Sequence, residues 1–206
     1  ADRVFEEYKN CYIYVERKLK NGSVRKGVVG KIDLEEYDYT KGSTTRVRAT
    51  EKTVVERIPP RLAVRRGAPL EMPHVMLLVD DADDILLSRF AGRGADAYSF
   101  DLAEGGGSVK ASFVYADEFE SLNSALAVLA QNAEKRAKNN GGAPITLAVG
   151  DGNHSLATAK ASWQEIRANL TEDEAKTHPS RYALVEVCNL HEESLVFEPI
   201  YRLIEN

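Results

Sequence analysis

The stretch Ile145-Thr-Leu-Ala-Val-Gly-Asp-Gly-Asn-His-Ser-Leu-Ala-Thr-Ala-Lys160 predicts a strand, a tight turn and a helix in immediate succession. Residues 145–149 form a short apolar run with the length of a buried strand. Gly150-Asp-Gly-Asn153 has the composition of a turn. Beyond this turn, apolar side chains recur at helical spacing: Leu156, Ala159, Trp163, Ile166 and Leu170. This order of elements predicts an α+β fold, a mixed β-sheet flanked by helices.

The turn itself has features of an anion site. Asn153 occupies the expected N-cap position, and Gly152 has no side chain that would keep a ligand away from the backbone. Amide groups at a helix N-terminus lack partners inside the helix and lie at the positive end of its dipole. Asp151 and His154 add groups for acid–base or metal chemistry. The alternative interpretation is a well-capped crossover helix whose polar residues have no function.

The rest of the chain supplies the other elements of a mixed sheet. Alternating or continuous apolar residues predict strands at 11–17, 24–33, 74–79, 96–102, 108–115 and 182–187, with a last apolar stretch at 195–204. Helices are expected at 53–58, 61–66 and 121–136, with Pro59-Pro60 interrupting the first two. Residues 20–23 predict a hairpin turn, and residues 34–39 a short acidic turn or helix. Because no stretch has the composition of a linker, we expect residues 1–206 to form a single α+β domain.

Composition excludes several classes of protein. The formal net charge of −5 argues against a broadly basic surface, so nucleic acid is not an expected partner. No apolar run approaches the ~20 residues of a membrane span, and no signal peptide is visible. We therefore expect a cytoplasmic protein that binds no membrane. In that compartment Cys11 and Cys188 are reduced by default, with one disulfide as the alternative.

Five blocks of the sequence resemble one bacterial family. They are Arg46-Val-Arg-Ala-Thr-Glu-Lys-Thr53, Arg57-Ile-Pro-Pro-Arg61, Gly67-Ala-Pro-Leu-Glu-Met-Pro-His74, Gly150-Asp-Gly-Asn-His-Ser-Leu-Ala-Thr-Ala159 and His178-Pro-Ser-Arg-Tyr-Ala183. The family is the uncharacterised domain-of-unknown-function family ten-fifteen, and the blocks extend over nearly the whole chain. Members of that family are longer than this chain, so we expect it to be a fragment of a longer family protein.

The family in turn resembles, more distantly, the ParB/sulfiredoxin-like clan. That clan includes partition proteins that bind CTP, sulfiredoxin, which uses ATP, and a free-serine kinase. Its members hold nucleotide phosphates against a Gly-His-Arg-like turn at a helix N-terminus. In family ten-fifteen the turn reads Asp-Gly-His-His-Arg, which corresponds to Asp151, Gly152, Asn153, His154 and Ser155. The resemblance therefore implies a ParB/sulfiredoxin-like fold with a nucleotide-phosphate site at the Gly150–Ser155 turn.

Two residues of this turn depart from the family pattern. Ser155 replaces the phosphate-holding arginine, and Asn153 replaces the first histidine. Losing a bidentate guanidinium removes a strong charge-assisted contact, so the backbone amides and the Ser155 hydroxyl would hold a phosphate more weakly. An arginine from another loop could supply the missing charge; the candidates are Arg46, Arg48, Arg57 and Arg61. Alternatively, nucleotide binding has been lost.

Glu51 is the candidate general base. The resemblance places it where the free-serine kinase has an acidic residue, and a carboxylate within ~3 Å of a hydroxyl can accept its proton. The alternative is a surface ion pair between Arg48 and Glu51 that contributes little. The candidate catalytic residues are thus Glu51, Asp151 and His154, and the candidate cofactor-binding residues are Gly150, Gly152, Asn153, Ser155, Arg46 and Arg48.

Evidence for a metal site is weaker. The four histidines, His74, His154, His178 and His191, form no short metal-binding repeat. One alternative is a site assembled from Asp151, His154 and His191. Another is Asp80-Asp81, which follows a predicted buried strand and could hold Mg²⁺ together with a nucleotide. Solvation of a loop explains these two carboxylates equally well.

The sequence thus predicts a phosphotransferase that uses ATP or ADP with Mg²⁺ and acts on a small hydroxylated molecule. The alternatives are a non-catalytic nucleotide-binding regulatory module and a protein- or DNA-interaction module that retains only the fold. If a site exists, Glu51, Asp151, Asn153 and His154 should line one cleft, with Arg46 or Arg48 close by.

Overall fold

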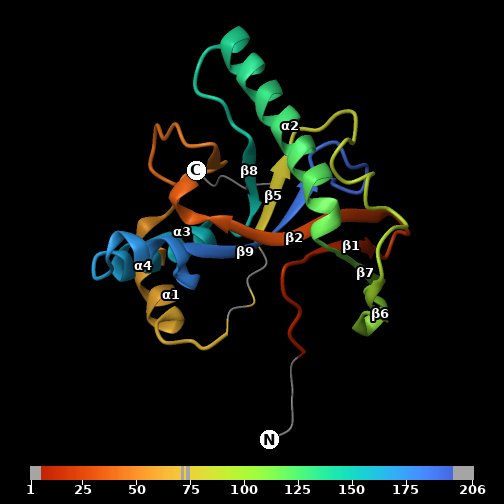
Figure 1. Cartoon of the computed structure of the whole chain (residues 1–206), viewed down its shortest axis with the longest axis horizontal. Helices are drawn as coiled ribbons and strands as arrows, with labels where there is room; N and C mark the ends of the chain where they lie inside the picture. Colours follow the sequence, from red (N-terminus) through yellow and green to blue (C-terminus); the bar gives the residue numbers. More distant parts are fainter. Residues whose placement is uncertain (1–5, 71, 73–74, 197–206) are drawn as a thin grey trace, which may run out of the picture.

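The computed structural model describes residues 6–70, 72 and 75–196. Their strands form one nine-stranded sheet in the order β3-β4-β8-β5-β9-β2-β1-β7-β6, with parallel and antiparallel pairs (Figure 1). The strands are β1 Tyr12–Lys18, β2 Val24–Asp33, β3 Tyr37–Asp38, β4 Val47–Ala49, β5 Val75–Val79, β6 Asp96–Asp101, β7 Ser108–Val114, β8 Leu147–Asp151 and β9 Tyr182–Asn189. The expected α+β class with a mixed sheet is confirmed.

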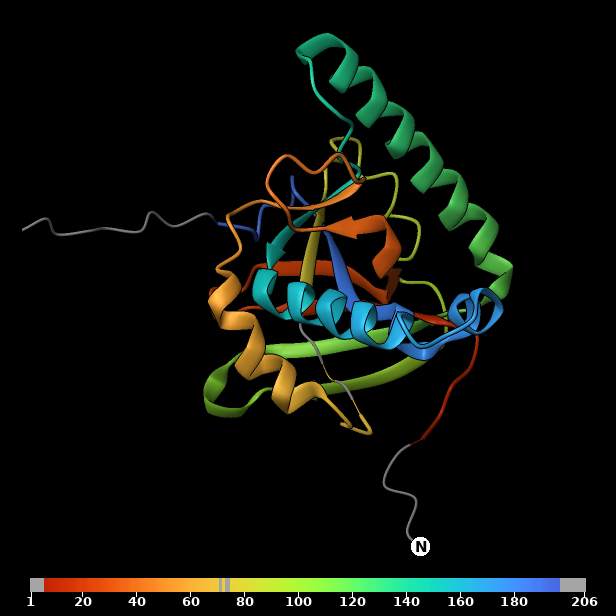
Figure 2. The ribbon, with the colours of Figure 1, turned by 90° about the vertical axis from the view of Figure 1, so that its left-hand side faces the viewer.

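Four α-helices are present in the described part of the chain. They are α1 Ile58–Arg65, α2 Phe119–Asn140, α3 Asn153–Arg167 and α4 Glu172–Thr177. Helix α3 lies across the strands with α1 beside it, whereas α2 runs along another part of the sheet and extends beyond it (Figure 2). Short 3-10 turns connect several elements: Leu34–Glu36, Val55–Arg57, Ala103–Gly105, Ala116–Glu118 and Pro179–Arg181.

The three apolar runs that the sequence marks as buried strands are neighbours at the centre of the sheet. β5 lies between β8, to which it is antiparallel, and β9, to which it is parallel. The hairpin of β1 and β2 and the pair β6–β7 also form where alternation predicts them. His74 and residues 197–206 belong to predicted strands but lie outside the described residues.

The prediction for residues 53–66 was wrong. Pro59 and Pro60 do not interrupt a helix; they lie in the first turn of α1, after a 3-10 turn at Val55–Arg57. A proline is well suited to the first helical turn, because an amide at that position has no partner within the helix and the fixed φ is already helical.

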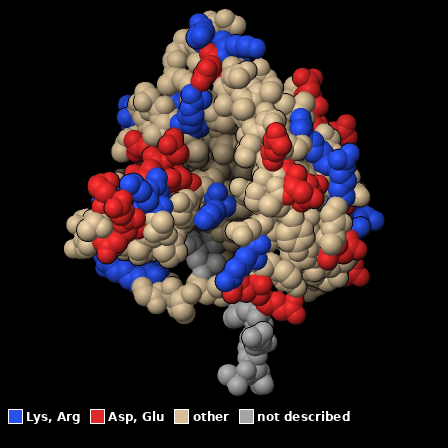
Figure 3. Space-filling view, in the orientation of Figure 1, with Lys and Arg blue, Asp and Glu red and all other residues tan. Residues whose placement is uncertain are grey.

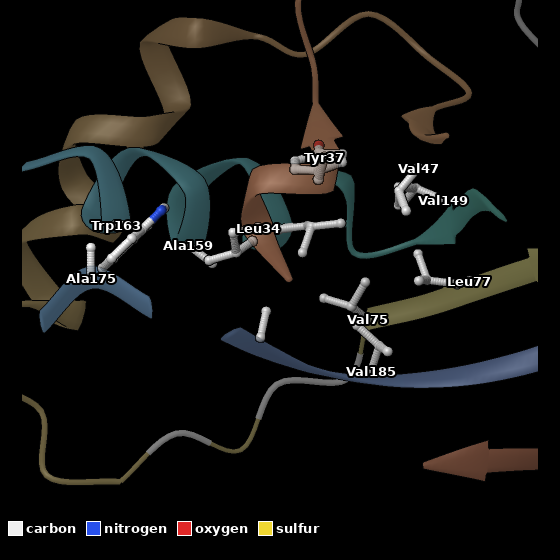
Figure 4. Close-up of a cluster of buried hydrophobic side chains, with 12 residues drawn as sticks. Leu34, Tyr37, Val47, Val75, Leu77, Val149, Ala159, Trp163, Ala175 and Val185 are labelled. Atoms are coloured by element: carbon white, nitrogen blue, oxygen red, sulfur yellow. The ribbon is translucent and has the colours of Figure 1, made fainter. Parts of the chain in front are cut away.

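The core consists of two adjoining clusters. One packs α3 and α4 against β5, β8 and β9, with Trp163, Leu156 and Leu34 fully buried (Figure 4). The other packs α2 and residues 86–90 against β1, β2 and β7. Along β5, Val75 and Leu77 belong to the first cluster and Val79 to the second, although alternation places all three on one face. The two clusters are therefore continuous along the central strand.

Candidate functional site

Two parallel strands bring the separate motifs together. β4 pairs in parallel with β8, with Val47 opposite Leu147 and Ala49 opposite Val149. The segment after β4, residues 50–54, and residues 150–153, which comprise the end of β8 and the turn into α3, therefore lie at the same edge of the sheet. Ligands in α/β sheets gather at such carboxyl ends. The structure thus gives a physical reason for Glu51 and Asp151 to be neighbours although they are far apart in sequence.

The turn after β8 depends on two glycines. Asp151 pairs with Met76 and Val149 with Leu77, so Gly150 is the extra residue of a β-bulge. A Cβ on Gly150 would lie 2.7 Å from Cγ of Leu78, which leaves no room for a side chain. Gly152 has φ +82° and ψ +22°, the left-handed conformation that only glycine adopts without cost. It is this residue that turns the chain from β8 into α3.

Asn153 does not have its predicted role. The N-cap of α3 is Gly152, and Asn153 is the first helical residue. Because the left-handed glycine completes the turn one residue earlier, the Asn153 side chain is buried, with 5% exposed. Its Nδ2 donates to Oγ1 of Thr53 at 3.2 Å. The side chain therefore fastens the segment after β4 to the helix.

His154 makes a second connection to the same segment. The backbone amide of Val54 donates to Nε2 of His154 at 3.1 Å, which requires the neutral ring to carry its proton on Nδ1. Thr50 adds a third link, since its Oγ1 donates to the carbonyl of Val149 at 2.7 Å. Residues 50–54 are thus held against β8 and α3 by three hydrogen bonds, which gives the site a fixed wall.

A cleft of about 440 Å³ lies at this strand edge. It is lined by Thr50, Glu51, Arg61, Val149, Gly150, Asp151, Gly152, Asn153, His154 and Ser155. The structure therefore brings Glu51, Asp151, Asn153 and His154 into one cleft, together with Ser155 and Arg61. No side chain of the described residues caps α3, so the amides of its first turn have no side-chain partner.

The charged side chains of the cleft are available for a ligand. Glu51 and Asp151 are exposed, and neither forms an ion pair with another described residue. The carboxylate of Asp151 accepts the amide of Gly152 at 2.8 Å, which orients it at the start of the helix. Arg61, from α1, donates to the carbonyl of Arg57 at 3.0 Å and has no carboxylate partner among the described residues. Of the arginines considered from sequence, Arg61 is the one that lines this cleft.

The two arginines predicted for the cofactor lie elsewhere. Arg46 forms an ion pair with Glu134 of α2 at 2.7 Å. The Arg48 guanidinium donates to the carbonyls of Ser43 at 3.2 Å and Ala143 at 2.7 Å. Neither arginine lines this cleft, although Arg48 lines the neighbouring cavity that also includes Glu51. The alternative surface pair between Arg48 and Glu51 is also not formed.

Asp80 and Asp81 are distant from the cleft, because β5 runs antiparallel to β8 and ends at the opposite edge of the sheet. Asp81 is buried and accepts the amides of Ile85 and Leu86. Asp80 contacts Nε2 of His191 at 2.7 Å, so His191 cannot join Asp151 and His154. Within residues 6–70, 72 and 75–196, no group of three or more His, Cys, Asp and Glu side chains could hold a metal ion.

Charges of both signs are distributed over the face of the molecule that Figure 3 shows. In Figure 3, Lys and Arg alternate with Asp and Glu over the visible face and form no continuous basic field.

Both cysteines are free. Among the described residues, no helix combines the length and apolar character that crossing a bilayer requires.

Comparisons with known proteins identify the family and nothing more specific. No curated protein and no solved structure matches the chain significantly. A family model does match, over residues 1–206, and its description reads "Protein of unknown function (DUF1015)". The chain therefore belongs to the DUF1015 family.

Proposed function

We propose that the cleft at the start of α3 binds the phosphates of ATP or ADP and transfers a phosphoryl group to a hydroxyl of a small molecule. One observation carries the proposal. The uncapped first turn of α3 opens into the same cleft as Arg61, Glu51 and Asp151, none of which forms an ion pair with another described residue. Phosphoryl transfer requires mainly positioning and neutralisation of charge, which this combination of groups supplies.

The amides of the first turn and Arg61 are the phosphate-binding groups of this proposal. A helix N-terminus attracts an anion through its unpaired amides and its dipole. Arg61 supplies the fixed positive charge that Ser155 cannot, and it enters from α1, a different element. Ser155 contributes a hydroxyl at the same edge.

Glu51 and Asp151 have separate roles in the proposed reaction. Mg²⁺ is commonly held by one or two carboxylates together with substrate phosphates, so Asp151 can ligate it without a complete protein cage. When bound, Mg²⁺ would neutralise charge on the phosphates. Glu51, on the facing segment, is placed to accept the proton of an acceptor hydroxyl. Asn153 and His154 are positioning residues, because their side chains fix the segment that carries Glu51.

A larger cavity next to the cleft has room for the remainder of the ligands. Its volume is about 660 Å³, and Thr50 and Glu51 line both spaces. Residues 38–43 and Arg48 also line it. Volumes of this size are typical of sites for small molecules and cofactors. With phosphates at α3, the acceptor or the nucleoside would extend past Glu51 into this cavity.

Calorimetric titration of the full-length protein with ATP, ADP, CTP and GTP, with and without Mg²⁺, tests the binding step. We expect Arg61→Gln to weaken binding at least about tenfold, since a charge-assisted hydrogen bond contributes ~1.5–3 kcal/mol. Arg46→Gln removes the same charge outside the cleft and should leave the affinity unchanged. Binding that survives the double variant Asp151→Ala/His154→Ala would place the ligand elsewhere.

Transfer of labelled phosphate from ATP to small hydroxylated compounds tests the catalytic step. Glu51→Gln should abolish transfer while preserving nucleotide affinity. Nucleotide binding without transfer to any acceptor would favour the non-catalytic regulatory module. No nucleotide binding at all would contradict the proposal and favour the interaction module.

A further inference from the structure

The sequence contains two Asn-Gly dipeptides, Asn21-Gly22 and Asn140-Gly141. Both are exposed, the first in the turn between β1 and β2 and the second where α2 ends. Such a dipeptide is chemically reactive, because the backbone nitrogen that follows an asparagine can attack the carbonyl carbon of its side chain. A following glycine makes this attack easiest, since it has no side chain that obstructs the nitrogen. Because glycine follows both asparagines, the difference between them depends mainly on the fold.

In the hairpin turn, both reacting groups of Asn21-Gly22 are held by hydrogen bonds. The amide nitrogen of Gly22, which would be the nucleophile, donates to the carbonyl of Leu19 at 2.9 Å. The side-chain oxygen Oδ1 of Asn21 accepts the amide of Ser23 at 3.0 Å and the Ser23 hydroxyl at 2.7 Å. An attack by Gly22 on Asn21 requires these bonds to break, so the turn protects this dipeptide.

At the end of α2, neither reacting group of Asn140-Gly141 is held. Asn140 is exposed, and its side chain forms no hydrogen bond with another described residue. Gly141 follows the last helical residue with φ +78°, and its amide has no acceptor among the described residues. A Cβ on Gly141 or Gly142 would meet nothing within 4 Å, so the nucleophile lies in open space. This end of α2 projects beyond the sheet (Figure 2), and fraying of a helix end gives the backbone the freedom that ring closure requires.

We propose that Asn140 is a site of spontaneous deamidation, at which the folded protein reacts far faster than at Asn21. Hydroxide removes the amide proton of Gly141, and the nitrogen attacks Cγ of Asn140. The new N–C bond closes a succinimide ring, the bond from Cγ to Nδ2 breaks, and the leaving group takes up a proton and departs as ammonia. Water then opens the ring at one of its two carbonyls, which gives aspartate or isoaspartate. Residue 140 thereby gains a carboxylate, and isoaspartate also adds one carbon to the main chain.

The modification would change the connection between α2 and the strand that leads to the candidate site. Residues 141–146 lead from α2 into β8, and the carbonyl of Ala143 accepts the Arg48 guanidinium at 2.7 Å. A carboxylate at the C-terminus of α2 is repelled by the negative end of the helix dipole. We therefore expect deamidation to fray the last turn of α2 and to shift the contact between Ala143 and Arg48.

Peptide mapping of the full-length protein measures the two rates side by side. The protein is incubated at pH 8 and 37 °C for several weeks and is then digested briefly at pH 6. Trypsin places the two asparagines in different peptides, residues 21–25 and 139–160. Mass spectrometry detects the replacement of the amide NH₂ by a hydroxyl, and electron-based fragmentation locates it and identifies isoaspartate. We expect Asn140 to be converted at least about tenfold faster than Asn21.

The same protein unfolded in guanidinium chloride is the matched control, because it keeps both sequences and loses the hairpin and the helix. There we expect the two rates to differ by less than about threefold, since glycine follows both asparagines. Asn140→Gln should leave the peptide of residues 139–160 almost unmodified in the folded protein, because ring closure from glutamine is much slower. Asn21→Gln should not change the rate at Asn140.

Three results would overturn the assignment. Equal rates at Asn21 and Asn140 in the folded protein would show that the hairpin bonds give no protection. A tenfold ratio that persists in the unfolded protein would attribute the difference to sequence alone. Undiminished conversion of the Asn140→Gln peptide would place the reaction at Asn139 or Asn153, the other asparagines of that peptide.

Discussion

Two opposite edges of the sheet, where β5 and β8 end, have similar geometry. They differ in what the backbone amides of the following turn are bonded to. At the edge where β5 ends, the chain's own Asp81 enters the turn, and its carboxylate accepts the amides of Ile85 at 3.0 Å and Leu86 at 2.8 Å. At the edge where β8 ends, no side chain takes that place, and the first amides of α3 open into a cleft. A carboxylate of the protein satisfies the first turn, whereas no described side chain satisfies the amides of the second.

This difference distinguishes structural acids from candidate functional acids. Asp81 is 2% exposed and inseparable from the packing of Leu86 and Leu87. Asp151 is exposed and holds only the adjacent amide of Gly152. An aspartate at the end of a strand is therefore a weak indication of function by itself. The amides that it satisfies, or leaves unsatisfied, are the more informative observation.

The largest expected effect is that of removing the structural acid. Asp81→Ala would leave the buried amide of Leu86 and the part-buried amide of Ile85 without this acceptor, and a buried group without a partner costs ~1–3 kcal/mol. We expect the free energy of unfolding to fall by about 3 kcal/mol in urea denaturation. Asp83→Ala, at an exposed residue of the same turn, should change it by less than about 0.5 kcal/mol. A loss below about 1 kcal/mol for Asp81→Ala would contradict the structural role.

A third strand end tests what happens when the acid also has a cationic partner. Asp33, at the end of β2, accepts the amide of Glu35 and pairs with Arg181 at 2.6 Å. Burial raises the pKa of Asp33, but the hydrogen bonds from Arg181 and Glu35 outweigh it, so the net pKa is lowered. The stabilisation is therefore present above the usual carboxyl pKa of about 4 and is lost as the pH falls through the lower folded value.

Asp33→Asn should accordingly destabilise the protein by about 1–2 kcal/mol at pH 7 and by progressively less below about pH 4. Urea denaturation of both proteins between pH 7 and pH 3 measures this difference. In an Arg181→Gln background the substitution should cost less at neutral pH. A cost that does not change with pH would show that the carboxylate charge is not responsible.

A smaller effect is expected from the residue that turns the chain at each edge. Gly152 has φ +82° at one edge, and Asp84 has φ +47° at the other. Gly152→Ala should cost about 1 kcal/mol because alanine is strained in the left-handed region. Gly152→Asn should cost less, as asparagine tolerates that region. Equal costs in urea denaturation would mean that backbone strain is not the cause.

Local patterns predicted the elements on which both edges are built. The spacing of Leu156, Ala159 and Trp163 identified the buried face of α3, and the apolar runs identified β5, β8 and β9. Both signals depend on residues close in sequence, so the pattern contains them. β3 and β4 were not predicted as strands, because Tyr37–Asp38 and Val47–Ala49 are too short to form a pattern. Their pairing beside β8 is a tertiary effect.

The candidate site was predictable in its residue types but not in its partners. The sequence could mark Glu51 and Asp151, yet it could not decide which of several arginines reaches them. Arg61 does so because α1 packs beside α3, whereas Arg46 meets Glu134 on α2. Asn153 was assigned as a cap because its residue type favours that position. The left-handed Gly152 completes the turn first, and the asparagine becomes a buried link to Thr53.

The smallest expected effect on stability comes from Asp151, and it gives the sharpest contrast with Asp81. Asp151→Asn keeps an acceptor for the amide of Gly152 and should change the free energy of unfolding by less than about 0.5 kcal/mol.

The same substitution should change the binding of phosphate and the binding of Mg-nucleotide in opposite directions. Removing a negative charge beside α3 should strengthen binding of inorganic phosphate in the absence of Mg²⁺. The same substitution should weaken the dependence of nucleotide affinity on Mg²⁺, because it removes a hard oxygen ligand. Calorimetric titration with phosphate, ATP and Mg-ATP measures the three affinities. Asp83→Asn serves as the control for net charge. If both substitutions changed phosphate and Mg-ATP binding equally, Asp151 would be an ordinary surface acid and the contrast between the two edges would carry no functional meaning.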